Sequence, residues 1–363
     1  MDTARARATL ARTQGLTAEA AEALIAAAGG DLGAALRLRA LSPVELPPAA
    51  RAFLAAPDER AIDADLEWLA ASGTVIVLCT DPGYPPLLRQ TAGAPAALYV
   101  QGEVALLATR QLAMVGSRSP TPAGRSTARE FAAWFARAGI TVTSGLATGI
   151  DTASHEGALK GGGATIAVFA TGLDRVYPYA NRELAARIRA HGALVSEFPP
   201  GIAPLPGNFP QRNRLIAGLT LGTLVVEATE RSGSLITARL ALEAGREVFA
   251  IPGSIHNPLS RGCHQLIRAG ATLVEEGKHV TKELGFSFPN ERLTDAPARG
   301  RERRELDKEY EMLLDAIGFE PATIDSLVAR TELPSASVAS MLLILELEGR
   351  VAALAGGRYG RIP

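Results

Sequence analysis

The sequence predicts an α/β protein in which a doubly wound parallel sheet is flanked by a helical domain on one side and a winged helix on the other. From residue 112 to residue 273, short apolar runs alternate with segments of helical periodicity, as strands and helices do in a doubly wound fold. Before and after this stretch the alternation is lost. At 363 residues the chain is also too long for one ordinary core, so we expect two or three domains.

Residues 1–72 are expected to form a small helical domain. They are rich in alanine, and apolar residues such as Leu24 recur at helical spacing. The pair Gly29-Gly30 can end one helix, and Asp31 can cap the next. These turns permit a SAM-like or helix-hairpin-helix fold. A role in packing or protein contact is favoured over DNA binding, because the clustered bases near the start are only Arg5, Arg7 and Arg12.

Residues 73–285 are expected to form the sheet domain. The predicted strands are 74–79, 97–102, 112–116, 141–144, 165–170, 194–197, 222–227, 247–251 and 271–273. The predicted helices are 122–138, 151–161, 181–191, 211–218, 233–245 and 260–269. Strand and helix in turn indicate parallel strands joined by helical crossovers.

Residues 286–305 are expected to be a linker, because Pro, Gly and alternating charge replace the hydrophobic pattern there. Residues 306–363 then predict a winged helix, with helices at 310–317, 324–330 and 335–348 and a strand at 351–354. The third helix contains Glu346 and Glu348 but no lysine or arginine, which makes it a poor reader of DNA. Protein contact or self-association is therefore favoured for this helix.

The charge of the chain is distributed unevenly. The formal net charge is -1, but the stretch from Arg110 to Arg268 holds 17 lysine and arginine residues against 10 aspartate and glutamate residues. The middle of the chain is therefore the part suited to a polyanion. The two cysteines, Cys79 and Cys263, lie among apolar or small residues and predict reduced structural thiols rather than a disulfide or zinc framework.

The location of the protein is also predicted from composition. Charged residues occupy the start of the chain where a signal peptide needs an apolar stretch, and no apolar run approaches the roughly 18 residues of a membrane span. We expect a cytoplasmic protein without a membrane span and without a cofactor.

Two glycine-containing loops follow predicted strands. In Gly116-Ser117-Arg118 the glycine lets backbone approach a phosphate, Ser117 offers a hydroxyl and Arg118 offers charge; the alternative is an ordinary turn with a surface arginine. The second loop begins at Ser144 and carries Gly145 and Gly149, which can form a nest of amides for an anion. No lysine follows its second glycine, so it is not a Walker loop.

Asp151, at the end of that second loop, is placed to cap the next helix. With His155 it shares one helical face, as a pair of metal ligands would. Capping and packing are favoured over a metal site, because no third ligand lies nearby in the sequence.

The segment Phe209-Pro210-Gln211-Arg212-Asn213-Arg214 joins an aromatic ring, a proline that suits a helix start, and two arginines. A stacking ring beside phosphate-binding cations is what a single strand of nucleic acid requires. The alternative is that Phe209 belongs to the core and one arginine pairs with Glu227 or Glu230. A further loop, Arg231-Ser232-Gly233-Ser234, places hydroxyls and amides at a helix N-terminus. None of these serines has an evident His and acid partner, so a hydrolase triad is not expected.

These loops, in this order, closely resemble the DNA-processing protein A family. The matching segments span about residues 80–275: Tyr84-Pro-Pro-Leu-Leu, Val115-Gly-Ser-Arg, Ser144-Gly-Leu-Ala-Thr-Gly-Ile-Asp, His155-Glu-Gly-Ala-Leu, Gly172-Leu-Asp174, Tyr177-Pro178, Asn181, Phe209-Pro-Gln-Arg-Asn-Arg-Leu-Ile, Val226-Glu-Ala, Arg231-Ser-Gly-Ser-Leu-Ile-Thr-Ala and Pro252-Gly. The helical start and the winged-helix end also fit the family's fuller architecture.

The resemblance implies a Rossmann-like domain that forms a homodimer, binds and protects single-stranded DNA, and helps load the RecA recombinase during natural transformation. The family's strand-binding positions correspond here to Gly116, Ser117, Arg118, Phe209, Arg212 and Arg214, and further to Gly145, Gly149 and Gly233. Together with the loop analysis, the predicted DNA-binding set also includes Ser144, Asn213, Arg231 and Ser234. The chain departs from many relatives at Pro206-Gly207-Asn208, where a basic or aromatic residue is usual, so a phosphate contact expected there is in doubt.

We expect a binding protein rather than an enzyme. The alternative is a nucleotide phosphohydrolase of the lysine-decarboxylase-like group, which shares a Rossmann-like fold and a glutamate at the sheet edge. Glu227 keeps this alternative open, whereas the PGGxGT signature of that group is absent from the sequence.

Overall fold

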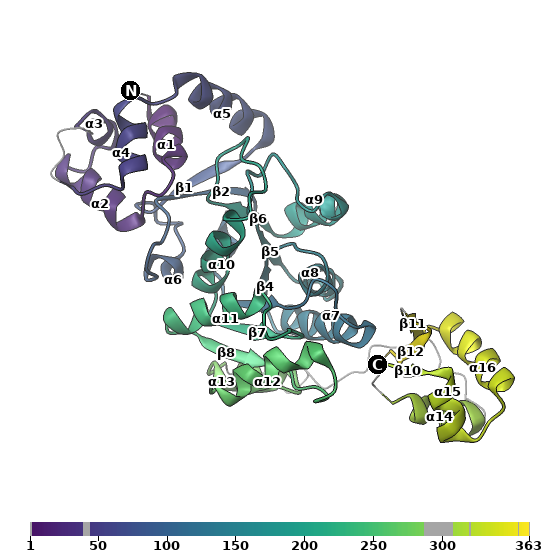
Figure 1. The fold of residues 1–363 in the computed structure, drawn as a ribbon. Helices are drawn as coiled ribbons and strands as arrows, with labels where there is room; N and C mark the ends of the chain where they lie inside the picture. The colour runs from purple at the N-terminus through teal and green to yellow at the C-terminus, as the bar shows by residue number, and fades with distance from the viewer. Residues whose placement is uncertain (1, 39–43, 287–307, 319–320, 355, 363) are drawn as a thin grey trace.

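The computed structural model describes residues 2–38, 44–286, 308–318, 321–354 and 356–362. Figure 1 shows helices at the N-terminus, a central sheet between helices, and a smaller unit at the C-terminus. The linker predicted at 286–305 lies, apart from Phe286, outside the described residues. The domain boundaries drawn from the sequence stay predictions.

The central sheet has nine strands in the order β1-β2-β6-β5-β4-β3-β7-β8-β9. Its strands are β1 (Val75–Leu78), β2 (Ala97–Gly102), β3 (Gln111–Val115), β4 (Thr141–Ser144), β5 (Thr165–Val168), β6 (Ala193–Ser196), β7 (Gly222–Val225), β8 (Glu247–Ala250) and β9 (Thr272–Leu273). Strands β3 to β9 run parallel, which confirms the doubly wound sheet. The sequence did not indicate that β1 and β2 add an antiparallel edge: β1 pairs with β2, and β2 pairs with β6.

Helices cover both faces of this sheet (Figure 1). The α-helices are α6 (Pro86–Arg89), α7 (Pro122–Arg137), α8 (Ile150–Lys160), α9 (Arg182–His191), α10 (Asn208–Leu219), α11 (Ser234–Glu243), α12 (Arg261–Arg268) and α13 (Gly277–Glu283), and the 3-10 turns are η1 (Val104–Ala108), η2 (Tyr179–Asn181) and η3 (Pro258–Ser260). Helix α10 begins three residues before the predicted 211, because Pro210 is tolerated within a first turn, where its missing N–H would have no partner.

Two apolar clusters pack against the sheet, as expected for parallel strands buried on both faces. Along β3, Leu112 and Met114 lie in one cluster, whereas Ala113 and Val115 lie in the other. This alternation follows from the two-residue period of a strand. The loop that follows β3 therefore starts from a strand that is packed on both faces of the sheet.

The N-terminal helices pack onto β1 and β2, with which they share one hydrophobic cluster. They are α1 (Thr3–Arg12), α2 (Ala18–Ala27), α3 (Leu32–Leu38), α4 (Pro48–Ala55) and α5 (Glu59–Ser72). The clustered arginines of α1 all form ion pairs: Arg5 with Glu59 and Asp63, Arg7 with Asp81, and Arg12 with Asp65. This pairing supports the packing role over DNA binding.

The C-terminal unit is a winged helix, as predicted. Its elements are α14 (Lys308–Ile317), β10 (Ala322–Thr323), α15 (Ile324–Thr331), α16 (Ser335–Leu347), β11 (Val351–Leu354) and β12 (Arg358–Arg361). The sequence missed β10 and β12, which are short strands that pair antiparallel with each other. Strand β12 lies against α7, and α16 lies on the outer side of the unit in Figure 1.

Across the described residues, no single helix has the length and apolarity to cross a membrane; α15 and α16 meet that test only as a pair bent by 111°.

Candidate nucleic-acid interface

A groove of about 600 Å³ lies at the carboxyl edge of the sheet, where the connections from β3 and β7 turn to opposite sides. Open α/β sheets bind ligands at such a switch point. The groove is formed by the loops after β3, β4 and β7 and by the start of α10. Of the predicted DNA-binding residues, it is lined by Gly116, Ser117, Arg118, Phe209, Arg212, Asn213, Gly233 and Ser234.

Arg118 and Phe209 stand between this groove and a smaller pocket of about 150 Å³, because both residues line both hollows. The guanidinium carbon of Arg118 lies 5.6 Å from the centre of the Phe209 ring, within cation–π range. Arg118 is exposed, whereas Phe209 is half-buried. The two residues thus present a cation and a ring side by side to solvent.

Arg212 lies at the floor shared by the two hollows. Its guanidinium is buried and donates through Nη1 to the carbonyl oxygens of Gly145 at 2.5 Å and Val168 at 2.7 Å. Burial lowers the pKa of Arg212 to about 10, while the nearby Asp151 carboxylate acts in the opposite direction. Arg212 is therefore a fixed positive charge that ties the loop after β4 to β5, whereas the sequence predicted an arginine that clamps a phosphate.

The position of Asp151 corrects the prediction that the backbone N–H groups of the loop after β4 are free to bind an anion. Asp151 does not cap α8, since the N-cap position belongs to Gly149. Its buried carboxylate instead turns back and accepts from the N–H groups of Gly145, at 3.1 Å, and Ala147, at 3.3 Å. Two amides that the sequence offered to a phosphate are thus bound to the loop's own carboxylate.

The loops after β3 and β4 pack directly on each other through Gly149. Gly149 has a φ of 85°, and a Cβ on it would clash with the carbonyl oxygen of Ser117. The Ile150 N–H donates to that same oxygen at 3.0 Å. Gly149 does not line the groove; its role in the structure is to let these two loops meet.

Glu227, which kept the phosphohydrolase alternative open, is bound within the fold. One carboxylate oxygen accepts from the Thr121 backbone N–H at 2.9 Å, and the other accepts from the Thr121 hydroxyl at 2.6 Å. Burial raises the pKa of Glu227, and the two hydrogen bonds oppose that shift. The carboxylate thus anchors the start of α7, which Thr121 caps.

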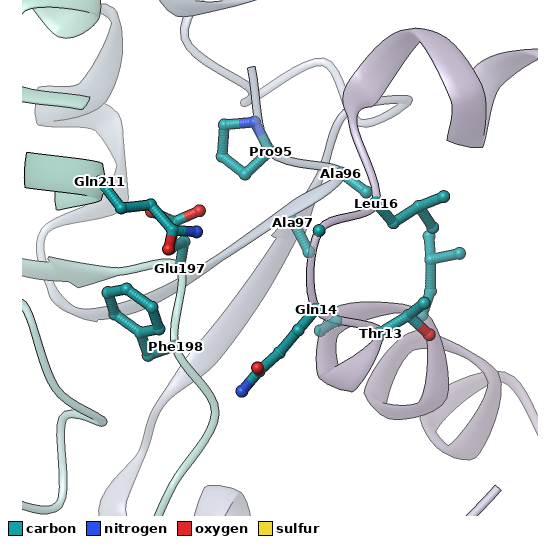
Figure 2. Close-up of a pocket in the computed structure, with 12 residues that line it drawn as sticks. Thr13, Gln14, Leu16, Pro95, Ala96, Ala97, Glu197, Phe198 and Gln211 are labelled. Carbon is teal, nitrogen blue, oxygen red and sulfur yellow. The ribbon is translucent and has the colours of Figure 1, made fainter. Parts of the chain in front are cut away.

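Arg214 is not brought to the groove. It forms an ion pair with Glu197, whose side chain is only 7% exposed. The acidic partner of this arginine is therefore Glu197 and neither Glu227 nor Glu230, which the sequence suggested. Glu197 lies next to Gln211 beside a small hollow of about 30 Å³, which Thr13 to Leu16 close from the N-terminal side (Figure 2).

Two other predicted residues do not line the groove or the pocket. Ser144 is buried, and its hydroxyl donates to the Met114 carbonyl at 2.6 Å, which ties β4 to β3. Arg231 is exposed on the loop after β7. In the same loop the hydroxyls of Ser232 and Ser234 lie 2.6 Å apart and bond to each other.

Asp151 and His155 do not form a metal pair, because Asp151 is engaged by the loop. His155 is fully buried, and its Nδ1 lies 2.7 Å from the Thr165 hydroxyl. That hydroxyl donates to the Val142 carbonyl, so Nδ1 must be the donor to Thr165 and Nε2 carries no proton. Burial lowers the pKa of His155 to about 3. The described residues contain no group of three or more His, Cys, Asp or Glu side chains that could hold a metal ion.

The groove adjoins a wider cleft of about 830 Å³ between the sheet domain and the winged helix, and Leu259 lines both. Arg330 and Arg358 line the cleft from the winged-helix side. The cations of this small unit that face the sheet domain thus come from α15 and β12, not from α16.

Sequence reasoning missed Tyr177, which lines the small pocket together with Ala147, Thr148 and Thr171. The Tyr177 ring lies 5.8 Å from the Phe209 ring, centre to centre. An available signal was the pair of tyrosines at 177 and 179 in the loop that follows β5, in a chain with few aromatic residues.

The fold and the groove together define a Rossmann-like protein whose sheet edge presents cations and aromatic rings suited to a polyanion. Residues 75–285, more than half of the chain, match the DNA recombination-mediator protein A family, and residues 296–357 match the DprA winged helix domain. The chain belongs to the DNA recombination-mediator protein A family, which confirms the resemblance drawn from the loops.

Known relatives match over much of their length. Protein Smf of Escherichia coli is 43% identical over 312 residues, covering 85% of this chain and 83% of that protein. The X-ray structure of DNA processing protein A from Streptococcus pneumoniae is 36% identical with a TM-score of 0.67, covering 79% of this chain and 99% of that one. The structure of DNA processing protein A from Helicobacter pylori, whose report describes its unique single-stranded DNA binding mode, is 28% identical with a TM-score of 0.53 and covers 58% of this chain and 95% of that one.

Proposed function

We propose that this protein binds single-stranded DNA along the switch-point groove and its adjoining pocket. The observation that carries the proposal is the contact of Arg118 with Phe209 at the boundary between the two hollows. Proteins that hold single strands combine a cationic groove with rings on which bases stack. The single-stranded DNA binding of the Helicobacter pylori relative supports the same ligand here.

Each element of the site has a distinct role in this proposal. Phe209 stacks against a base, and Arg118 neutralises a phosphate beside it. Arg212 adds a buried positive charge below both hollows, where water screens it poorly. Asn213, Ser117 and Ser234 offer polar groups along the groove. The small pocket is much narrower than the groove and suits a single group, such as one base turned out of the strand.

The wider role that we propose is to protect incoming single-stranded DNA and help load RecA during natural transformation, as a cytoplasmic homodimer without catalytic activity. Membership of the family supports this role. The test is to follow RecA polymerisation on single-stranded DNA with and without the protein, while light scattering gives its mass. A lack of stimulation contradicts the loading role, and a monomeric mass contradicts the dimer.

DNA binding itself is tested by titrating a labelled oligo-dT of several tens of nucleotides at low and moderate salt. Wild type is compared with Arg118→Ala and with Arg187→Ala, which removes the same charge from an exposed position on α9. We expect Arg118→Ala to weaken binding and to reduce the salt slope by about 0.7, the contribution of one phosphate contact on a single strand. Arg187→Ala should bind like wild type.

The possible outcomes distinguish binding in the groove from a general attraction of DNA to positive charge on the surface. Equal weakening by both arginine variants would mean that net charge, rather than this groove, controls binding. An absence of binding by wild type would overturn the proposal, and release of free base from nucleoside monophosphates would revive the phosphohydrolase alternative.

A further inference from the structure

The loop between β5 and α9 exposes two aromatic rings at the same sheet edge. Tyr177 is 49% exposed and touches the Phe209 ring, whereas Tyr179 is 71% exposed. The guanidinium carbon of Arg182 lies 4.7 Å from the centre of the Tyr179 ring. Rings and cations thus follow each other from Arg118 through Phe209 and the two tyrosines to Arg182.

The backbone that carries these tyrosines is held in place. Two residues after Tyr179, the buried Asn181 donates from Nδ2 to the Leu146 carbonyl at 2.8 Å and to the Thr152 hydroxyl at 2.9 Å. Both acceptors belong to the loop and helix that follow β4. The two rings are therefore presented to solvent by a segment that is hydrogen-bonded to the loop after β4, and other residues of that loop line the small pocket.

Single exposed apolar residues are common on protein surfaces and by themselves indicate nothing. Here the first ring is continuous with Phe209, and the second ring is paired with an arginine. Arg182 also approaches Glu183 at 3.2 Å, but both side chains are exposed, and such surface pairs are weak enough for a phosphate to replace. Three aromatic rings flanked by two cations suit a single strand, whose bases stack on rings and whose phosphates need a positive charge nearby.

We propose that Tyr177, Tyr179 and Arg182 form an additional nucleotide-binding site, which extends the path of single-stranded nucleic acid beyond the small pocket toward α9. Bases stack on the two tyrosines, and Arg182 contacts the phosphate beside Tyr179. The site rests on the proposed function, because it continues the strand from Phe209. It requires oligonucleotides longer than those that fill the groove alone.

The experiment is a length series of oligo-dT from about 4 to about 16 nucleotides, the range of site sizes for single-strand binding folds. It compares wild type, a Tyr179→Ala/Arg182→Ala variant and Tyr179→Phe, which keeps the ring. The matched control is Leu242→Ala, which removes an exposed side chain on α11 outside the path. Thermal unfolding of each variant checks that the fold is kept.

We expect the double variant to bind the longest oligonucleotide roughly 5- to 100-fold more weakly and the shortest one like wild type. Tyr179→Phe and Leu242→Ala should match wild type at every length. Photo-crosslinking of an oligonucleotide carrying 5-iodouracil should link Tyr179 only when the oligonucleotide is long.

Other results overturn the extended site in distinguishable ways. If the double variant binds all lengths like wild type while Arg118→Ala is weakened, the groove is correct and the extension is wrong. If the double variant loses affinity equally at all lengths, Tyr179 and Arg182 do not act beyond the groove. If wild type binds no oligonucleotide, both the proposed function and the extension fail.

Discussion

The groove at the sheet edge and helix α16 of the winged helix differ in what they present to solvent. The groove presents Arg118 next to Phe209, with the buried charge of Arg212 beneath them. Helix α16 has no lysine or arginine and exposes Leu343, Ile344 and Leu347 beside acidic residues. In winged and other helix-turn-helix proteins the corresponding helix is the usual reader of DNA. The comparison teaches that a fold known for DNA binding does not by itself locate a DNA site, and that the placement of cations and rings is what supports the site that we propose.

The largest effect is expected when the positive charge of Arg212, beneath the groove, is removed. Arg212→Met leaves the Gly145 and Val168 carbonyls without their donor and Asp151 without its nearby cation. We expect the free energy of unfolding to fall by about 3–5 kcal/mol, because these groups remain buried. Denaturant unfolding measures this change. Arg231→Met, at an exposed position, is the control and should stay within about 0.5 kcal/mol.

The loss of the Phe209 ring from the groove is expected to have a smaller effect, on DNA binding, than the loss of Arg212 has on stability. Phe209→Ala should weaken oligo-dT binding by about 1–3 kcal/mol, the usual contribution of one stacked base. Fluorescence anisotropy titration measures it. Unchanged affinity would remove the stacking role and leave the groove as a site of charge alone, which weakens its contrast with α16.

The pH dependence of stability also distinguishes the sheet domain from the winged helix, because the sheet domain contains the buried His155 on α8, whereas the winged helix, residues 306–363, contains no histidine. The pKa of His155 is lowered to about 3 in the fold, so the unfolded chain takes up a proton near its ordinary value of about 6.5 while the folded chain does not. Stability is therefore complete above about pH 6.5 and falls as the pH decreases, by about 1–2 kcal/mol at pH 5.

The His155 effect is measured as the difference between wild type and His155→Asn in unfolding free energy from pH 7 to pH 5. Buried carboxyls such as Asp151 and Glu197, whose pKa values burial raises, contribute to both proteins and largely cancel in this difference. A difference that does not change with pH would mean that His155 takes up its proton in the fold at the same pH as in the unfolded chain.

The smallest effect is expected on α16. Leu347 is 78% exposed, and Leu347→Lys places a cation on the helix that sequence reasoning disfavoured for DNA. We expect oligo-dT affinity to stay within about twofold, because the helix lies away from the groove, and stability to change by less than about 0.5 kcal/mol. A large, salt-sensitive gain in affinity would show that the strand reaches α16 and would break the comparison.

The sequence predicted the sheet domain well because its strands are buried on both faces. Strands β2 and β4 have the predicted bounds and β9 ends at the predicted residue, whereas the other strands end one or two residues earlier than predicted. The groove-forming loops were also identified. The antiparallel edge was not, since apolar runs carry no information about strand direction.

The site residues were predicted less well for geometric reasons. Arg212 and Arg214 are two positions apart on α10, which turns them about 200° from each other around the helix. They therefore cannot face the same groove, and Arg214 pairs with Glu197 instead. The reversal of Asp151 onto its own loop depends on backbone geometry that a glycine pattern does not specify.

The hydrogen bonds inside the groove loops have a consequence for the rate at which DNA would leave the site that we propose. The N–H groups of Gly145 and Ala147 are held by Asp151, and that of Ser117 donates to the Glu227 carbonyl. A single strand of DNA in this groove would be held largely by side chains, which can detach one at a time, rather than by backbone N–H groups in fixed positions. Such a grip permits stepwise release, so that a second protein could take over the strand from one end while the other end is still held.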